Sequence, residues 1–497
     1  MIQLNRKAAK MSAAAPLPER VLQFGEGGFL RAFVDWMFHE MNSRKLFNGR
    51  IVAVQPIADG LVSVLNQQDG LFTLLLRGLR DGQPTEETTI ISSISRGINP
   101  YTQWNEYLRC AEDPAMEFIV SNTTEAGITY DGADRPDMTP PASFPAKLAV
   151  YLYHRFRHFG GDPTKGVVIL PCELIDRNGD NLKAIVLRLA REWQWPGDFT
   201  NWLTTHCHFL NTLVDRVVTG YPRDEAAALT EQLGYEDKLL NTGELFHLWV
   251  IEGPAYLAEK LPFTQAGLHV VWTDDMTPYR TRKVRILNGA HTASVPAAFL
   301  YGLETVGQMM DHEVMGAFVR QTVYEEIVPS VKLDQTLMTE FADAVIERFR
   351  NPYIRHYLLS ILLNSSAKFK ARVLPSILEY HEQYGTLPGR LVFSLAALIA
   401  LYKDGIVDGS NMQGRRAEGS FTLRDDDWAL EFLAGAWQEY DGTADGATTV
   451  ARKVLSHTRL WGQDLNSLPG LTVLTAAYLQ QIAADGIRSA LHPLVRG

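Results

Sequence analysis

Apolar positions in the first part of the chain follow two alternating periods. The run RVLQF at 20–24 is short and strand-like, and it leads into the turn GEGGF at 25–29. Four apolar residues then recur at spacings of three and four, which predicts one apolar helix face: Leu30, Phe33, Met37 and Met41. IVAVQP at 51–56 is the next strand candidate. A strand, a glycine-rich turn, a helix and a strand in this order predict a parallel α/β sheet with a right-handed crossover.

Strand and helix candidates continue to about residue 275. The other strand candidates are LFTLLLRG, TTIISSI, EFIVSN, GVVILPCE, HLWVIEG and LHVVWTDD. Asp81-Gly82 and Pro84 separate the first two, which predicts an antiparallel hairpin. Helical periodicity covers 145–156 and 181–193. The first part of the chain is therefore predicted to be an α/β domain.

The character of the chain changes after about residue 280, where strand alternation disappears. Helices are predicted at 288–303, 311–327, 334–349, 353–364, 371–382, 390–403, 426–438, 446–456 and 471–484. We place the boundary near Asp274–Pro278. The chain is thus expected to consist of a flexible lead-in at 1–18, an α/β domain at 19–276 and a mainly α-helical domain at 277–497.

Composition excludes several classes of protein but does not identify a function. The 497 residues carry 47 basic and 57 acidic side chains, a net charge of −10, which argues against nucleic-acid binding driven by bulk charge. Three cysteines cannot form a disulfide framework. We find no apolar stretch of about 18 residues and no secretory signal. These features lead us to expect a cytoplasmic protein that does not bind membranes, either a monomer or a homodimer.

The glycine-rich turn is placed where a dinucleotide-binding fold holds a pyrophosphate. It consists of Gly25, Glu26, Gly27, Gly28 and Phe29. Glycines let backbone N–H groups approach phosphates, and the following helix adds its positive end. The third glycine of the G-x-G-x-x-G pattern falls on Leu30, and any tight turn can use two glycines. The flanking strand and helix favour dinucleotide binding.

Two strand ends are further candidates for cofactor contacts. The second strand ends Val54-Gln55-Pro56 and lacks the acid that normally binds the ribose hydroxyls. Gln55 is the substitute candidate, although it is also consistent with a solvent-facing strand end. No arginine in that turn is available for a 2′-phosphate, which mildly favours NAD over NADP. Ser121 and Asn122 end a core strand and are expected to approach the ribose or the nicotinamide.

A Lys–Asn–His group opens the helical part of the chain, within RTRKVRILNGAHTA. Asn288 and His291 share one face if a helix begins there, and Lys283 precedes them by five residues. A desolvated lysine can act as general acid for a forming alcohol, and an amide N–H can stabilise the developing alkoxide. The spacing alone is also consistent with a surface base among Arg280, Arg282 and Arg285, and with Asn288 as a helix cap.

These segments together resemble the mannitol dehydrogenase family of polyol-specific long-chain dehydrogenases/reductases. The resemblance covers nearly the whole chain, and its markers are GEGGFLRAF, SNTTEAG, LNTLVDRV, KVRILNGAH and RFRNPYIRHYLLSILLNSSAKFKARVLP. It implies an N-terminal Rossmann-type domain that binds a nicotinamide cofactor, no metal, and an active site in the cleft facing a helical C-terminal domain.

The resemblance also implies roles for single residues. By position, Lys283 matches the family's general acid/base, Asn288 the oxyanion donor and His291 the residue that positions substrate. Asp215 and Lys368 match substrate contacts. This chain departs from mannitol-type members where a second oxyanion asparagine is replaced by Leu174, and where a substrate-contact arginine falls on Ser360. These two departures put mannitol in doubt as substrate.

The form PCELI, read with QFGEGGFLRAFVDW, most resembles the branch of the family that interconverts D-tagaturonate and D-altronate with NADH/NAD. Such an acidic sugar needs a cationic partner for its carboxylate. Lys368 is the first candidate and Arg355 the second, because a guanidinium can bind a carboxylate through two bonds. The alternatives are reduction of fructuronate or mannitol dehydrogenation within the family, and a non-catalytic NAD-binding sensor or interaction protein outside it.

Overall fold

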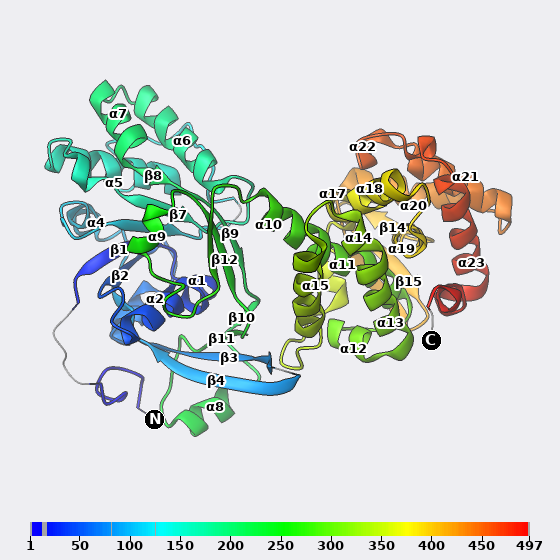
Figure 1. Cartoon of the computed structure of the whole chain (residues 1–497), viewed down its shortest axis with the longest axis horizontal. Coiled ribbons are helices and arrows are strands. Elements are labelled where there is room, and N and C mark those ends of the chain that lie inside the picture. Colours follow the sequence, from blue (N-terminus) through cyan, green and yellow to red (C-terminus); the bar gives the residue numbers. More distant parts are fainter. Residues whose placement is uncertain (1, 12–16, 81, 125, 496–497) are drawn as a thin grey trace. The chain divides into compact units, whose positions relative to one another are not determined.

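The computed structural model describes residues 2–11, 17–80, 82–124 and 126–495. The chain divides into two compact units, Met1–Arg80 with Pro84–Met276 and Asp81–Gln83 with Thr277–Gly497. Each is described by itself below (Figure 1). Among the described residues, no helix is both long and apolar enough to cross a membrane.

Six parallel strands form the central sheet of the first unit, in the order β5-β2-β1-β6-β7-β8. Their bounds are β1 (Glu19–Phe24), β2 (Arg50–Val54), β5 (Ile94–Ile98), β6 (Phe118–Ser121), β7 (Val168–Pro171) and β8 (His208–Phe209). Counted within this sheet, the strand order is third, second, first, fourth, fifth, sixth, which is the order of Rossmann-type dinucleotide-binding sheets. The structure confirms the predicted parallel α/β fold.

Most helices of the first unit lie between these strands along the chain. They are α1 (Gly28–Ala32), α2 (Val34–Ser43), α3 (Val62–Gln67), α4 (Trp104–Cys110), α5 (Phe144–His158), α6 (Asn178–Glu192), α7 (Gly197–His206), α8 (Ala226–Leu233) and α9 (Tyr256–Lys260). The continuous helix predicted after the glycine-rich turn is wrong in one respect, because the helix breaks at Phe33. There the carbonyl of Ala32 accepts from the Arg216 guanidinium instead of from a helical amide (2.6 Å).

Successive strand residues face two separate cores. In β2, Ile51 and Ala53 belong to the core that includes α2, whereas Val52 and Val54 belong to the core that includes α5, α6 and α7. The same alternation holds in β6 and β7. Burial on both faces explains why these strands are continuous apolar runs in the sequence.

Two smaller sheets complete the first unit. One has the order β10-β11-β3-β4 and the other β13-β12-β9. Their bounds are β3 (Phe72–Arg80), β4 (Gln83–Ile91), β9 (Asn211–Asp215), β10 (Val218–Gly220), β11 (Asn241–Glu244), β12 (Leu248–Glu252) and β13 (Val270–Thr273). β3 and β4 are neighbours, as the hairpin prediction requires, and Gly82 between them has a positive φ of 72°.

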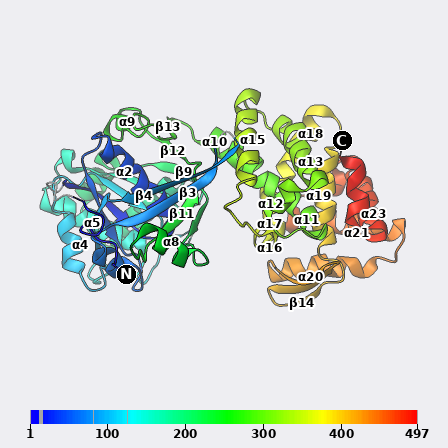
Figure 2. The same cartoon turned by 90° about the horizontal axis from the view of Figure 1, so that it is seen from below.

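The second unit is mainly helical, as predicted. Its helices are α10 (Thr277–Arg282), α11 (Gly289–Leu300), α12 (Val306–Asp311), α13 (Glu313–Thr322), α14 (Val328–Ser330), α15 (Gln335–Phe349), α16 (Leu358–Ile361), α17 (Ser365–Arg372), α18 (Leu374–Tyr384), α19 (Gly389–Ala400), α20 (Asp427–Ala436), α21 (Ala444–Leu455), α22 (Thr458–Trp461) and α23 (Leu471–Leu491). Every residue from 390 to 400 is buried, so α19 forms the centre of this unit. It packs against α11 and α23, and α23 also runs beside α21 (Figures 1 and 2).

Two predictions for the second unit are wrong. Strand alternation does not disappear, because β14 (Ile406–Asp408), β15 (Asn411–Arg416) and β16 (Gly419–Arg424) form an antiparallel sheet, with β14 beside α20 in Figure 2. The helix predicted at 353–364 is reduced to α16. The preceding segment is held extended instead, through a bridge between Thr305 and Tyr357.

The predicted flexible lead-in, residues 1–18, lies partly outside the described residues, which omit 1 and 12–16. In its described part, Leu4 is buried and its N–H donates to the carbonyl of Glu236 (2.8 Å). The N–H of Arg6 donates to Asp69 (3.0 Å). These bonds attach residues 2–11 to the first unit.

Candidate active site

The glycine-rich turn follows β1 at the carboxyl end of the parallel sheet. Gly25 has a φ of 115°, and a Cβ there would lie 3.0 Å from the carbonyl oxygen of Asn122. A Cβ on Gly27 would meet no atom within 4 Å. Gly28 is held from behind, because its carbonyl accepts from the Asn241 side chain (2.7 Å). Gly25 therefore permits the close approach of β6, while the backbone at Gly27 faces open space.

Glu26 and Gln55 organise the loop that follows β2. The Glu26 carboxylate accepts from the N–H of Leu61 (2.9 Å), and burial raises the pKa of Glu26. The Gln55 amide donates to the carbonyls of Ile57 (2.9 Å) and Ala58 (2.7 Å). Gln55 is buried, so it is not the solvent-facing strand end that the sequence also allowed. Its contact with a ribose stays a prediction.

The predicted cofactor contacts Ser121 and Asn122 are positioned by the segment after β7. The Ser121 hydroxyl donates to Glu173 Oε2 (3.0 Å), and the Asn122 side chain donates to the Cys172 carbonyl (2.9 Å). Both the N–H and the hydroxyl of Thr123 donate to Glu173 Oε1 (3.0 and 2.9 Å). Burial raises the pKa of Glu173, and these bonds oppose that rise. Glu173 thus fixes the loop beside the glycine-rich turn.

A buried polar pair lies behind the same turn. The Gln23 amide donates to the carbonyl of Gly25 (3.0 Å) and to Asp35 (3.3 Å) on α2. Complete burial raises the pKa of Asp35 to about 7, although Gln23 and Arg31 act against the rise. The backbone of the turn is therefore supported by side chains that spacing alone does not reveal.

These features fit a dinucleotide cofactor. The open space at Gly27 leaves the turn backbone accessible, and the turn lies at the carboxyl ends of β1 and β6, where open parallel sheets bind ligands. Glu26, Phe29 and the other predicted cofactor residues are brought together there. No cluster of three or more potential metal-ligating side chains occurs among the described residues.

In the second unit, Lys283 and Asn288 begin and end one π-helical segment, Lys283–Asn288. Single π-helical turns are uncommon and are frequent at functional sites, because the extra residue re-aims the side chains of the turn. Asn288 is half-buried and caps no helix with its side chain, which removes the helix-cap alternative. The carbonyl of Asn288 accepts from the Thr292 hydroxyl (2.8 Å).

Arg285 anchors this π-helical segment. Its guanidinium is buried and donates to Ser376 (2.8 Å), to Glu379 (2.9 Å) and to Ser330 (3.3 Å). The interpretation of this stretch as a row of surface bases is therefore wrong for Arg285. The anchor fixes the backbone on which Lys283 is carried.

His291 lies one turn further along α11, in an aromatic environment. Its ring stacks on Phe349 at 4.0 Å and meets the edge of His356 at 5.2 Å. Its Nε2 is buried without a hydrogen-bond partner in the described part of the chain. Burial lowers the pKa of His291 well below its usual value, and the nearby His356, Arg348 and Arg372 side chains lower it further. The imidazole is neutral, and one polar atom is available to a ligand.

Lys368 lies on α17, which packs against both α11 and the π-helical segment. It is half-buried, and its Nζ donates to the Ile361 carbonyl (2.9 Å). The N-terminus of α17 is held by Asp425, which accepts from the N–H and the hydroxyl of Ser366 (3.1 Å each). Arg355 and Ser360 are exposed. The structure therefore packs the helix that carries Lys368 against the elements that carry the Lys–Asn–His group, which the sequence does not show.

The remaining predicted residues belong to the first unit. Asp215 ends β9 and is buried. Leu174, in place of the second oxyanion asparagine, follows β7 and is 58% exposed. The Leu174 side chain is therefore not part of the hydrophobic core.

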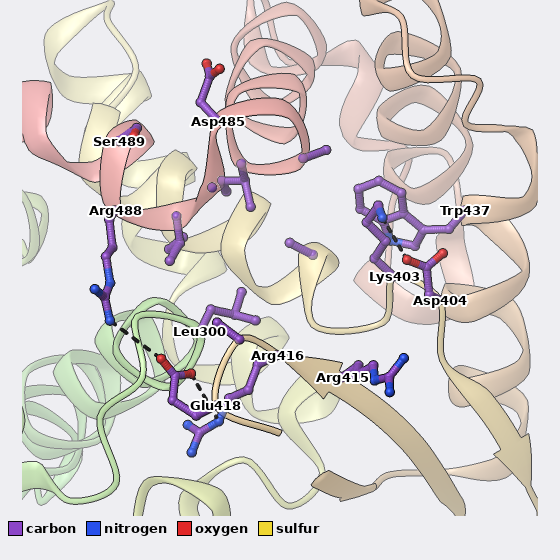
Figure 3. A pocket seen from close by; sticks show the side chains of 16 residues that line it. Leu300, Lys403, Asp404, Arg415, Arg416, Glu418, Trp437, Asp485, Arg488 and Ser489 are labelled. Atoms are coloured by element: carbon purple, nitrogen blue, oxygen red, sulfur yellow. Dashed lines mark hydrogen bonds and ion pairs between the residues drawn. The ribbon is translucent and has the colours of Figure 1, made fainter. Parts of the chain in front are cut away.

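One open cavity of about 480 Å³ occurs elsewhere in the second unit. It lies beside the kink of α23 at Gly486 and between the ends of α19 and β15 (Figure 3). Glu418 pairs there with Arg416 and Arg488 (3.7 and 3.5 Å). None of the predicted site residues lines it, so it is separate from the chemistry described above.

Both units match models of known protein families. The Mannitol dehydrogenase Rossmann domain matches residues 19–265, and the Mannitol dehydrogenase C-terminal domain matches residues 275–483. The chain belongs to the mannitol dehydrogenase family. This confirms the family resemblance of the sequence, and the Lys–Asn–His group falls in the C-terminal family domain.

Relatives and solved structures agree with this assignment. Altronate oxidoreductase of Bacillus subtilis (strain 168) is 46% identical over 475 residues, which are 96% of this chain and 95% of that protein. The Yersinia enterocolitica altronate oxidoreductase is 48% identical over 95% of this chain and 96% of its own. The mannitol 2-dehydrogenase of Pseudomonas fluorescens, solved with NAD and D-mannitol, covers 99% of both chains with a TM-score of 0.70 and 21% identity. A D-sorbitol dehydrogenase structure covers 99% of this chain and 100% of its own (TM-score 0.79, 18% identity). The two structures establish the fold.

Proposed function

We propose that this protein is an NAD-dependent oxidoreductase that interconverts D-tagaturonate and D-altronate. The observation that carries the proposal is the identity of 46–48% to altronate oxidoreductases along about 95% of the chain. The Lys283–Asn288 π-helix and the neutral, unpartnered His291 agree with it, because they supply a base, an amide and an imidazole for carbonyl chemistry.

The cofactor is assigned to the first unit. Gly25, Gly27 and Gly28 would hold its pyrophosphate, while Gln55, Ser121 and Asn122 would contact its sugars or nicotinamide. When bound, NADH supplies the hydride. Without a cation in the loop after β2 for a 2′-phosphate, the proposal favours NAD over NADP.

The protein supplies the proton and the positioning. Lys283 donates a proton to the ketone oxygen as the alcohol forms, and in the reverse direction it accepts that proton. The Asn288 amide stabilises negative charge on the same oxygen. His291 donates from its ring to a substrate hydroxyl, and Asp215 accepts from another. Lys368, with Arg355 as the alternative, binds the carboxylate.

A substrate panel tests this proposal. The initial rate of NADH oxidation would be measured with D-tagaturonate, D-fructuronate and D-fructose, and repeated with NADPH. We expect the highest kcat/KM with D-tagaturonate and NADH. A higher kcat/KM with D-fructuronate or D-fructose would show that D-tagaturonate is not the preferred substrate. NADH binding without turnover of any substrate would indicate a sensor instead of an enzyme.

A further inference from the structure

The surroundings of His291 include a second histidine with no assigned role. His356 belongs to the extended segment between α15 and α16, and its ring lies edge-on to His291 with 5.2 Å between centroids. Phe349 covers the other side of His291 at 4.0 Å. One imidazole is therefore held between a phenyl ring and another imidazole.

The backbone of His356 is fixed while its side chain remains available. Its carbonyl accepts from the N–H of Val306 (2.9 Å), and the neighbouring residue Tyr357 bridges to Thr305. The half-buried His356 side chain makes no hydrogen bond with any described residue. A polar ring that is rigidly placed, half-buried and unsatisfied is costly unless a ligand or water pairs with it.

Lys368 provides the charge near this ring. Burial lowers the pKa of His356, and the positive charge of Lys368 lowers it further. The ring is therefore neutral near neutral pH and can donate one N–H, while Lys368 contributes an ammonium group. Arg355, the alternative cation, is exposed and makes no ion pair among the described residues. A neutral donor beside a fixed cation suits an anion better than a neutral hydroxyl.

We propose that His356 and Lys368 form the subsite for the substrate's carboxylate, next to the hydroxyl contact of His291. This inference rests on the proposed function and extends it. The keto-uronate carries its carboxylate at the end of the carbon chain away from the ketone, so the subsite must be separate from Lys283. His356 is then a binding residue that determines preference for an acidic sugar over the neutral ketose of equal length.

Three variants test the subsite. His356→Ala removes the ring, His356→Gln keeps a neutral N–H donor, and His356→Glu adds a negative charge. His492→Ala, at an exposed histidine of the same unit, is the matched control. For each, kcat and KM would be measured with D-tagaturonate and with D-tagatose, the ketose that has a hydroxymethyl group in place of the carboxylate. NADH affinity and Tm report whether folding is intact.

We expect His356→Ala to lower kcat/KM for D-tagaturonate roughly ten- to hundredfold, mainly through KM, because a hydrogen bond to a charged group is lost. The value for D-tagatose should fall much less, because that sugar has no carboxylate to lose a hydrogen bond. His356→Gln should recover part of the loss, and His356→Glu should lose more than alanine.

The outcomes separate the two proposals. Equal losses with both sugars, or no loss in His356→Ala, would overturn the subsite while the function stands. A wild-type enzyme that does not prefer D-tagaturonate over D-tagatose would overturn the function itself and, with it, the subsite.

Discussion

Glu173 provides the sharpest structural test of how the cofactor loop is held. Its carboxylate is 2% exposed and accepts three hydrogen bonds, one from Ser121 and two from Thr123. Glu173→Ala leaves these three donors without their acceptor. Thr123 is half-buried, so water can replace part of the loss. At roughly 1–3 kcal/mol for an unsatisfied buried group, we expect a destabilisation of about 2–4 kcal/mol.

Glu173→Gln is the matched variant. Its amide oxygen can still accept from Thr123, and the Ser121 hydroxyl can rotate to accept from the amide nitrogen. The glutamine also avoids the cost of a buried charge, which raises the pKa of Glu173 in the wild type. We therefore expect its stability to lie within about 1 kcal/mol of the wild type.

Thermal unfolding and NADH fluorescence titration measure both effects. Because Asn122 lies beside Gly25, we expect Glu173→Ala to weaken NADH binding while Glu173→Gln retains it. Equal losses of stability and NADH affinity in the two variants would contradict this expectation, because the negative charge and not the hydrogen bonds would then hold the loop.

Three further predictions follow from buried groups. Arg285→Met should lower kcat and destabilise the second unit by about 2–4 kcal/mol, which unfolding by urea would measure. The loss should be smaller than for a fully buried ion pair, because Glu379 is partly exposed. Burial raises the pKa of Asp35 to about 7, so its contribution to the free energy of unfolding is complete below pH 4 and is lost as the pH rises through 7. The Tm of Asp35→Asn should therefore rise relative to that of the wild type between pH 5 and pH 8. A difference in Tm between the two proteins that stays constant over this range would contradict this prediction. Asp425→Ala should raise the KM for tagaturonate more than the KM for NADH, because α17 carries Lys368; equal changes would contradict it.

The sequence predicts most of the parallel sheet because burial on both faces produces continuous apolar runs between turns. The β14–β16 sheet was missed since its residues are largely polar and only a few face the core, such as Met412, Phe421 and Leu423. The break at Phe33 was missed because it depends on Arg216, which lies far along the chain.

The candidate site, like the fold, is only partly predictable from the sequence. The residue types and order of Lys283, Asn288 and His291 are visible in the sequence, together with the glycine-rich turn. Their support is not visible: Arg285 reads as another surface base because its partners lie 45 to 94 residues away. His356 falls in a segment predicted to be helical, where its position beside His291 has no sequence signal.

In the proposed reaction, Lys283 supplies the proton for reduction of a keto-uronate by NADH. The most direct measurement is the rate of NADH oxidation with saturating D-tagaturonate for wild type and Lys283→Ala, with NADH affinity measured in parallel. We expect kcat to fall by about 10²- to 10⁴-fold, as for loss of a general acid, while NADH binding is nearly unchanged. A Lys283→Ala enzyme that retains wild-type turnover would contradict it.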